Sequence, residues 1–324
     1  MSDVKKIVLV GAGTMGSHHA RVVAQSQRAE LTMLVDPRES VGKAIAAKFG
    51  STWVPELPDL DGIDGVIVAA ATEAHYPLAM SVLESGTALL VEKPVSDSLL
   101  KTQEILALAE QKNLALMCGL LERFNPAIIT ARSLMRDPFH ITATRHSPYA
   151  SRIKTGVAWD LLVHDVDLAI QLMGANPNGV ESRLGFFHPE SEAGAEDVVE
   201  TILEFEGGPI AHISASRVGQ RKIRQVSIYE SERLIELDLI RRDITVYHHV
   251  DENSADGEGR GYRQQTVIDI PELVTSQEPL VGQFEHFLDL IEGTKDAAAE
   301  RASILPSHIV IDSVTAKRAE RGAK

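Results

Sequence analysis

Two side chains on one predicted helix have the types and the spacing for acid–base chemistry. Asp160 and His164 are four residues apart in the stretch 157–173, whose apolar pattern predicts a helix, so both project from one face. An imidazole, with an ordinary pKa of about 6.5, can accept a proton from a hydroxyl group, and a nearby carboxylate can orient the ring. If this helix stood alone, a buried histidine with ordinary hydrogen bonds would be the better interpretation.

A third reactive side chain, Lys93, lies between Glu92 and Pro94, directly after the apolar run 88–91. That run predicts a buried strand, and in open α/β sheets ligands bind outside the carboxyl ends of the strands. A lysine at this position would therefore point toward a ligand, where its ammonium group could stabilise charge developing on an oxygen. A solvent-exposed loop lysine is the alternative, and spacing alone leaves it open.

A glycine motif early in the chain identifies the ligand that such a sheet would bind. Gly11, Gly13 and Gly16 follow the β-branched run 7–10 with the spacing G-x-G-x-x-G and precede an amphipathic stretch, 14–25. This arrangement allows a tight turn, a close approach of backbone to a pyrophosphate, and packing of a helix whose N-terminus favours an anion. The motif predicts a dinucleotide site that includes Thr14 and Met15, with a purely structural turn as the alternative.

The end of the second predicted strand, 31–35, indicates which dinucleotide binds. Asp36 lies 20 residues after Gly16, where a carboxylate accepts hydrogen bonds from the ribose hydroxyls of NAD. A carboxylate would repel the 2′-phosphate of NADP, so we expect NAD, although Arg38 keeps NADP possible. The predicted strand 65–71 should also end beside the cofactor, where His75 could contact it. A histidine at the start of a helix, with ordinary hydrogen bonds to its ring, is an equally good interpretation of His75. The remaining expected cofactor contacts are Ala71, Thr72, His75, Glu92, Lys93 and Pro94.

Composition limits the classes of protein to which the chain can belong. A net charge of −14 argues against nucleic acid as a general partner, since phosphate binding requires a basic face. The single cysteine, Cys118, rules out a disulfide within one chain, and no apolar run reaches membrane-spanning length. We expect a cytoplasmic protein with no membrane partner and no bound metal, because His164, Asp165 and Asp167 do not converge on a helix.

Two domains of different architecture are predicted. Residues 1–122 alternate strands and helices, which predicts an NAD(P)-binding Rossmann domain with a doubly wound parallel sheet. Residues 123–324 contain successive strand-like runs, so we expect an α+β domain with an open, mostly antiparallel sheet for substrate binding and oligomerisation. The acidic, glycine-rich segments 188–200 and 251–263 predict hairpin or surface loops. Helices near 278–293 and 306–318 should cover that sheet or return to the first domain.

Four sequence blocks, in order and with matching spacing, resemble the glucose-fructose oxidoreductase and inositol dehydrogenase family, often called Gfo/Idh/MocA. The blocks are GAGTMG with Asp36, AATEAHYPLA, SGTALLVEKPVS and GLLERFNPA. The resemblance implies that Lys93 lies between nicotinamide and substrate, and that Asp160 and His164 work with it as catalytic residues. It implies an NAD(P)-dependent oxidoreductase that transfers a hydride between nicotinamide and a secondary alcohol of a sugar, cyclitol or nucleotide sugar. It also implies a homo-oligomer, a dimer or tetramer, paired through the second sheet.

Within the family, the segment 145–168 looks most like nucleotide-sugar 3-dehydrogenases, which favours a UDP-N-acetylglucosamine-type 3-dehydrogenase as an alternative. Arg145, Arg152 and Lys154 could then neutralise a diphosphate, or they could pair with the chain's many carboxylates. A non-catalytic dinucleotide-sensing regulator is a rival that the intact catalytic set disfavours. A reductase of a carboxylated or amino substrate is another rival, because it would use the basic cluster Arg217, Arg221, Lys222 and Arg224. Charges at a strand edge that suppress aggregation are the better interpretation of this cluster.

Overall fold

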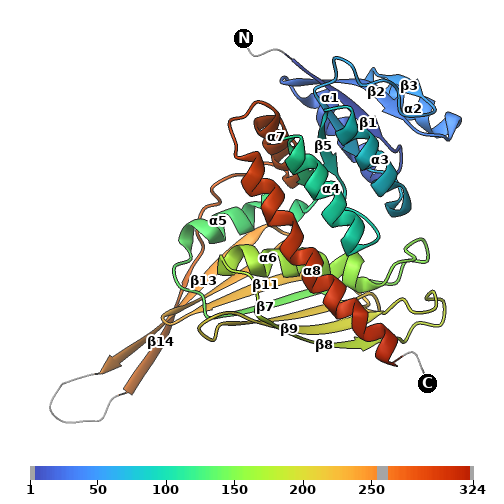
Figure 1. Ribbon diagram of the computed structural model, residues 1–324. Coiled ribbons are helices and arrows are strands. Elements are labelled where there is room, and N and C mark those ends of the chain that lie inside the picture. The colour runs from blue at the N-terminus through green and yellow to red at the C-terminus, as the bar shows by residue number, and fades with distance from the viewer. Residues whose placement is uncertain (1–3, 254–261, 322–324) are drawn as a thin grey trace. The chain divides into compact units, whose positions relative to one another are not determined.

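The computed structural model describes residues 4–253 and 262–321. The chain divides into two compact units, each of which is described by itself (Figure 1). The first comprises Met1–Leu121 and Glu278–Asp312, and the second comprises Glu122–Gln277 and Ser313–Lys324. Among the described residues, no helix combines the length and the apolar character needed to cross a membrane.

The first unit is built on a six-stranded parallel sheet with the order β3-β2-β1-β4-β5-β6. The four-residue strands β4 and β5 are buried along their whole length, as expected for a parallel sheet that is covered on both faces. The strand order reverses between β1 and β4, which places a crevice at their carboxyl ends. The strands are β1 (Lys5–Val10), β2 (Ala29–Val35), β3 (Thr52–Val54), β4 (Gly65–Val68), β5 (Ala88–Val91) and β6 (Leu116–Cys118).

Helices of the first unit include one that comes from the far end of the sequence. Helix α7 packs on α1, and its Phe287 ring lies so close to β4 that a Cβ at Gly65 would be 3.0 Å from it. Arg28 binds Glu285, Asp289 and Glu292 of the α7 region at 2.6–2.8 Å. The helices are α1 (Thr14–Gln25), α2 (Glu39–Phe49), α3 (Thr72–Glu84), α4 (Leu99–Gln111), α7 (Pro279–Ile291) and α8 (Ala297–Arg321), whose last residues belong to the second unit.

The second unit contains an eight-stranded sheet with the order β14-β13-β12-β11-β7-β10-β9-β8. All neighbours are antiparallel except β7 and β10, which are parallel. The strands are β7 (His140–His146), β8 (Gly179–Gly185), β9 (Val198–Glu204), β10 (Ile210–Ser216), β11 (Ile223–Glu230), β12 (Arg233–Asp238), β13 (Asp243–Asn253) and β14 (Tyr262–Asp269). The predicted fold class, a Rossmann sheet followed by a mostly antiparallel one, is confirmed.

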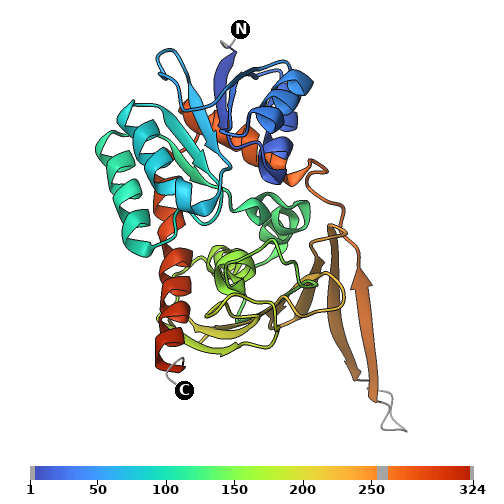
Figure 2. The ribbon, with the colours of Figure 1, turned by 90° about the vertical axis from the view of Figure 1, so that its right-hand side faces the viewer.

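Helices of the second unit lie on one face of its sheet (Figure 2). Alternate residues of β7, β9 and β10 are buried beneath them, which is the period-2 pattern of a sheet with one covered face. The opposite face carries half-exposed side chains that include Ile202 and Ile210. The helical segments are η1 (Leu121–Phe124), which begins at the boundary between the units, α5 (Pro126–Leu134), the π-helical segment η2 (Ala158–Leu162) and α6 (Val163–Met173).

Two strands were not predicted from the sequence. β8 was not recognised at all, and β14, which begins at Tyr262, was not identified as a strand, although the acidic stretch 251–263 was expected to be a hairpin or a surface loop. β13 likewise extends to Asn253, while residues 254–261 lie outside the described part of the chain. Main-chain pairing holds both strands, since β14 pairs antiparallel with β13 and β8 pairs antiparallel with β9. Side-chain propensity alone therefore gave no signal for them.

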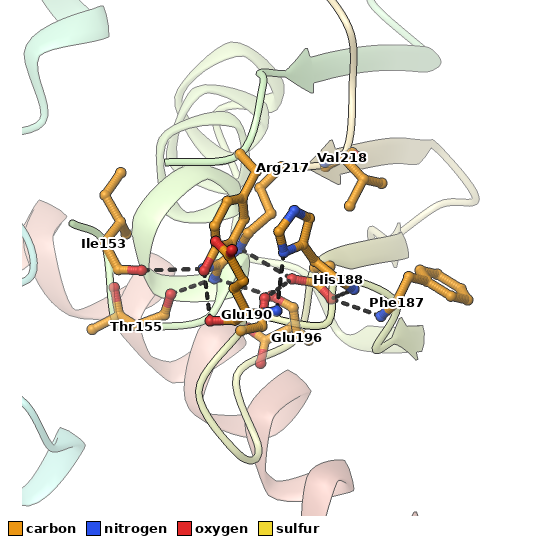
Figure 3. A network of polar contacts seen from close by, with 12 residues as sticks. Ile153, Thr155, Phe187, His188, Glu190, Glu196, Arg217 and Val218 are labelled. Carbon is orange, nitrogen blue, oxygen red and sulfur yellow. Dashed lines mark hydrogen bonds and ion pairs between the residues drawn. The ribbon is translucent and has the colours of Figure 1, made fainter. Parts of the chain in front are cut away.

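Buried charge ties together three loops of the second unit (Figure 3). The Asp197 carboxylate accepts hydrogen bonds from the backbone amides of Phe187 and His188 at 2.6 and 2.8 Å, and Arg217 lies 3.6 Å away. Arg217 in turn donates to the carbonyl of Thr155. Burial would raise the pKa of Asp197, but the backbone amides and Arg217 outweigh it and lower the pKa.

We predict that Asp197→Asn lowers the free energy of unfolding by about 3 kcal/mol at pH 7, because a buried charged acceptor loses its hydrogen bonds. A depressed folded-state pKa gives stability that is complete above the unfolded-state pKa of about 3.9 and is lost as pH falls through the folded-state value. The difference between wild type and variant should stay constant from pH 7 to 5 and shrink below about pH 4. Urea unfolding at several pH values measures it, and a constant difference down to pH 3 would contradict the assignment.

Candidate active site

The carboxyl ends of four parallel strands bring the predicted cofactor residues to one edge of the first sheet. Gly11–Gly16 follow β1, Asp36 follows β2, Ala71 and Thr72 follow β4, and Glu92–Pro94 follow β5. Thr72 and His75 fall inside the first four residues of α3. These positions are the ones that bind ligands in open α/β sheets.

The three motif glycines have different surroundings. A Cβ at Gly16 would lie 1.8 Å from the carbonyl oxygen of Gly11, so helix α1 packs on the loop as only glycine permits. Gly11 has a φ of 102°, which favours glycine, and a Cβ there would meet the backbone of Ala69. A Cβ at Gly13 would have nothing within 4 Å. Gly13 therefore leaves open space at the uncapped N-terminus of α1, as a pyrophosphate group requires.

Asp36 is held from two sides. Its Oδ2 accepts a hydrogen bond from the amide of Ala12 at 2.7 Å, which links the end of β2 to the glycine loop. Arg38 forms a bidentate pair with both oxygens at 2.8 and 2.9 Å. Burial would raise the pKa of Asp36, but Arg38 and the Ala12 amide outweigh it and lower the pKa, so the carboxylate stays ionised. An ionised carboxylate at this position fits the ribose hydroxyls of NAD.

Lys93 is half-buried, and the residues on both sides of it are fixed by buried histidines. His19 of α1 lies 2.7 Å from the Oε1 atom of Glu92, and both side chains are buried. The His75 ring lies 2.8 Å from the carbonyl oxygen of Pro94 and 3.1 Å from that of Ala70. The loops after β1, β4 and β5 are thus joined by side-chain hydrogen bonds, which fix the backbone that carries Lys93.

In the second unit, Asp160 and His164 lie on either side of the junction between η2 and α6, and both side chains are half-buried. A buried carboxylate holds the start of this segment, because Glu196 accepts a hydrogen bond from the amide of Ala158 at 2.8 Å. A Cβ at Gly156 would lie 2.2 Å from this carboxylate. Glycine at 156 therefore makes room for the group that caps the helical turn carrying Asp160.

Two buried arginine–aspartate pairs fix the next turn. Arg145 of β7 binds both carboxylate oxygens of Asp165 at 2.7 and 2.9 Å. Arg123 of η1 binds both oxygens of Asp167 at 2.7 and 2.6 Å. Both carboxylates, one and three residues after His164, are thus bound by arginines from other elements. Bidentate pairs of this kind restrict the rotation and translation of α6.

A further buried carboxylate, Glu122, completes the cluster around Arg145. Glu122 Oε1 lies 2.9 Å from Arg145 and 3.2 Å from Arg224, and its Oε2 atom accepts a hydrogen bond from Asn125. Burial would raise the pKa of Glu122, but the two arginines outweigh it and lower the pKa. Asp165 and Glu122 likewise outweigh burial and raise the pKa of Arg145. At Asp165, burial outweighs the attraction of Arg145 and raises the pKa of the carboxyl group. Glu122 and Arg145 therefore stabilise each other's charged forms more clearly than Asp165 and Arg145 do.

Several residues of these sites were not identified from the sequence. His19 occurs three residues after Gly16 on the buried face of an amphipathic helix, and a polar residue on such a face was the available signal. Glu122 lies within the block GLLERFNPA but was assigned no role. Glu196 lies in a stretch expected to be a solvated loop, so its 0% exposure could not be anticipated.

Comparison with known families agrees with this geometry. Residues 5–120 match the model of an oxidoreductase family with an NAD-binding Rossmann fold. Residues 127–235 match the model of the Gfo/Idh/MocA C-terminal domain.

The chain belongs to the Gfo/Idh/MocA family. It is an NAD-dependent oxidoreductase, as the four sequence blocks predicted.

Individual relatives of this Gfo/Idh/MocA protein include sugar and cyclitol enzymes. UDP-N-acetylglucosamine 3-dehydrogenase of Acidithiobacillus ferrooxidans is 26% identical over 243 residues, which are 74% of this chain and 76% of that protein. Its solved structure has a TM-score of 0.82 at 24% identity and covers 98% of this chain and 99% of that one. Inositol 2-dehydrogenase of Rhizobium meliloti is 27% identical over 223 residues, 64% of this chain and 68% of that protein. A levoglucosan dehydrogenase complex with NADH and levoglucosan has a TM-score of 0.82 at 17% identity, with 98% of each chain covered.

The glycines of the cofactor loop provide a matched pair of variants. We predict that Gly16→Ala destabilises the fold by roughly 2 kcal/mol or more, because its methyl group would overlap the Gly11 carbonyl. Gly13→Ala should leave the free energy of unfolding within about 0.5 kcal/mol of wild type. It should nevertheless weaken NAD on the order of 10-fold or more, since its methyl group enters the space for the pyrophosphate. Urea unfolding and calorimetric NAD titration separate the two effects, and tight NAD binding by Gly13→Ala would contradict the assignment.

Proposed function

We propose that this protein is an NAD-dependent dehydrogenase that oxidises a secondary alcohol of a sugar-like molecule. The observation that carries the proposal is the combination, in one Gfo/Idh/MocA chain, of the glycine loop with Lys93 and an Asp160/His164 pair on a rigidly held helical segment. Bound NAD supplies the hydride acceptor. The chain's own residues position the substrate and move its hydroxyl proton.

His164 is proposed as the general base. Its imidazole would accept the proton of the reacting hydroxyl group, and Asp160 would orient the ring and stabilise the imidazolium that forms. The pairs Arg145–Asp165 and Arg123–Asp167 support this role, because they fix the turn of α6 on which His164 lies. A base held in this way needs little reorganisation before it reacts.

Lys93 is proposed to bind the reacting oxygen. Its ammonium group would donate a hydrogen bond to that oxygen and stabilise negative charge as the proton leaves. The hydrogen bonds of Glu92 to His19 and of Pro94 to His75 support this role, since they hold the backbone on either side of the lysine.

A sugar, a cyclitol and a nucleotide sugar are the substrate classes that the relatives' names suggest. A UDP-N-acetylglucosamine-type 3-dehydrogenase is the more specific candidate, favoured by the relative from Acidithiobacillus ferrooxidans that matches over 98% of the chain in structure. A panel of sugars, cyclitols and UDP-sugars tested for NADH formation distinguishes these classes. A protein that binds NAD tightly but oxidises none of them would instead be a dinucleotide-sensing regulator.

We predict that Lys93→Ala and His164→Ala each lower kcat by about 10²- to 10⁴-fold, the usual contribution of acid–base groups, while NAD affinity changes little. Asp160→Asn should have a similar or smaller effect. Steady-state kinetics with the best substrate of the panel and a calorimetric NAD titration measure both quantities. Lys112→Ala, at the exposed end of α4, serves as the control and should retain wild-type kinetics. Wild-type turnover in either of the first two variants would refute the mechanism.

The uncovered face of the second sheet is proposed to pair subunits in a homo-oligomer, a dimer or a tetramer. Ile202 and Ile210 are 42% and 40% exposed there, on neighbouring antiparallel strands. Apolar side chains on a sheet face without helices are stabilised when a second copy covers them.

We predict that light scattering of the purified protein at micromolar concentration gives the mass of a dimer or a tetramer. Ile202→Glu should shift the equilibrium toward monomer, because the carboxylate would be buried without a partner. Ile240→Glu, at an exposed turn, is the control and should preserve the assembly. A monomeric wild type at this concentration would rule out the proposed interface.

A further inference from the structure

Two arginines lie side by side beneath the helical segment that carries Asp160 and His164. Arg224 of β11 is the direct cross-strand partner of Arg145 of β7. Both share a face with the buried residues of their strands, which is the face covered by α6. Both also bind the same atom, Oε1 of Glu122, at 2.9 Å from Arg145 and 3.2 Å from Arg224. Like charges placed opposite each other in a sheet are unfavourable, so this pair needs an explanation.

Arg145 is accounted for by the structure of the protein itself. Its side chain is 3% exposed and makes two hydrogen bonds to Asp165 and one to Glu122. These contacts exclude the role considered for it in the sequence analysis, the neutralisation of a bound diphosphate. Lys154, which was considered with it, forms an exposed pair with Glu192 at 2.9 Å. The predicted alternative, pairing with the chain's own carboxylates, accounts for Arg145. Lys154 has such a partner only at the surface, and Arg152 is exposed.

Arg224 differs from Arg145 in both exposure and partners. Its side chain is 41% exposed, and within the described residues its one hydrogen-bonded acceptor is Glu122, reached through Nη1. The Nε and Nη2 donors of this guanidinium therefore remain available on the half-exposed side. A planar guanidinium with free donors can bind phosphate or carboxylate groups in a bidentate manner.

The electrostatics connect Arg224 to the proposed catalytic segment. Burial and the neighbouring charge of Arg145 lower the pKa of Arg224, and Glu122, Asp165 and Asp160 act in the opposite direction. Geometry makes the same connection, because Arg145, the cross-strand neighbour of Arg224, binds Asp165, the residue that follows His164. A ligand group bound to Arg224 would therefore lie on the sheet face beneath the segment that carries Asp160 and His164.

The loop before β11 adds positive charge. Arg221 and Lys222 are exposed, and in the part of the chain that the structure describes neither makes an ion pair. The loop is held in place because the amide of Gly219 donates to the carbonyl of Ser147, while Arg217 is buried against Asp197. Both residues precede Arg224 by three residues or fewer and add positive charge to this end of β11.

We propose that Arg224, assisted by the cations of the preceding loop, is the anion-binding residue of the substrate site and takes a phosphate or carboxylate group of a sugar-like substrate. This inference rests on the proposed function of Asp160 and His164. It makes Arg224 a residue that determines specificity rather than a catalytic one, because its donors bind an anionic group of the substrate and take no part in the proton transfer. Arg224 would not strengthen the binding of neutral sugars or cyclitols.

Equilibrium binding tests the site independently of turnover. UDP and inorganic pyrophosphate are titrated by calorimetry into protein saturated with NAD, so that the cofactor site is filled. Arg224→Ala should weaken UDP binding on the order of 10- to 100-fold, the usual effect of losing a charge-assisted pair. Arg224→Gln, which can still donate to Glu122 and so protects the fold, should show the same loss. Arg183→Ala, an exposed strand arginine on β8, is the matched control and should bind as wild type does.

Kinetics with different substrates separate the two oxyanion sources. UDP-N-acetylglucosamine carries phosphate, glucuronate carries a carboxylate, and glucose and myo-inositol carry neither. The expected result is a rise in KM in both Arg224 variants for the anionic class that the enzyme uses, with a fall in its selectivity over neutral substrates. Three results would overturn the proposal. They are an equal loss of activity with charged and neutral substrates, an unchanged UDP affinity in Arg224→Gln, and a wild type that binds no anion. If the wild type oxidises nothing in the panel, the proposed function fails, and the calorimetric titration still decides the role of Arg224.

Discussion

Burial of charge is the constraint on which the second unit depends. A carboxylate or guanidinium that leaves water must be paired, and removing one partner leaves an uncompensated charge that costs about 3–5 kcal/mol. The Asp165 and Asp167 side chains, 2% exposed, can be buried on α6 because Arg145 and Arg123 meet them in bidentate geometry. Directional pairs also permit few alternative positions, so the helix has one favourable placement on the sheet. The position of His164 follows from this arrangement.

In the first unit, individual hydrogen bonds fix the residues at the ligand edge of the sheet. Its ligand edge is assembled from loops that follow different strands, and loops are ordinarily the most mobile part of a fold. Here Ala12 is joined to Asp36, His19 to Glu92, and His75 to the carbonyl of Pro94. Each of these bonds is buried, where competition from water is absent. The loops therefore act as one connected edge of the sheet rather than as independent segments.

The sequence predicted the features that depend on local pattern. Glycine spacing, the buried strands of the first sheet and the carboxylate Asp36 follow from adjacent residues. They lie close to where they were expected, except that the strand predicted over 65–71 ends at Val68. Partners that come from distant parts of the chain could not be predicted. Glu196 meets the turn of Ala158 across 38 residues, and Arg145 meets Asp165 across 20, without any repeating pattern that marks them. The basic residues before the helix were thus open to two interpretations until their acceptors were known. The sequence also left open whether the last helices cover the second sheet or join the first domain. The contacts of α7 place it in the first unit.

The divided sequence of the first unit has a consequence for how the protein is made. A ribosome that has released all six strands of the Rossmann sheet has not yet made α7, so the Phe287 ring beside Gly65 and the three acids around Arg28 are missing. The stretch from Glu122 to Gln277 must be synthesised first, which takes roughly 10 to 30 s at typical bacterial and eukaryotic rates. During that interval an apolar part of β4 has no native cover. Translation of the first unit begins first, but this unit is completed only after nearly all of the second unit has been synthesised. The nascent chain must therefore keep the incomplete Rossmann sheet from aggregating while the second sheet forms.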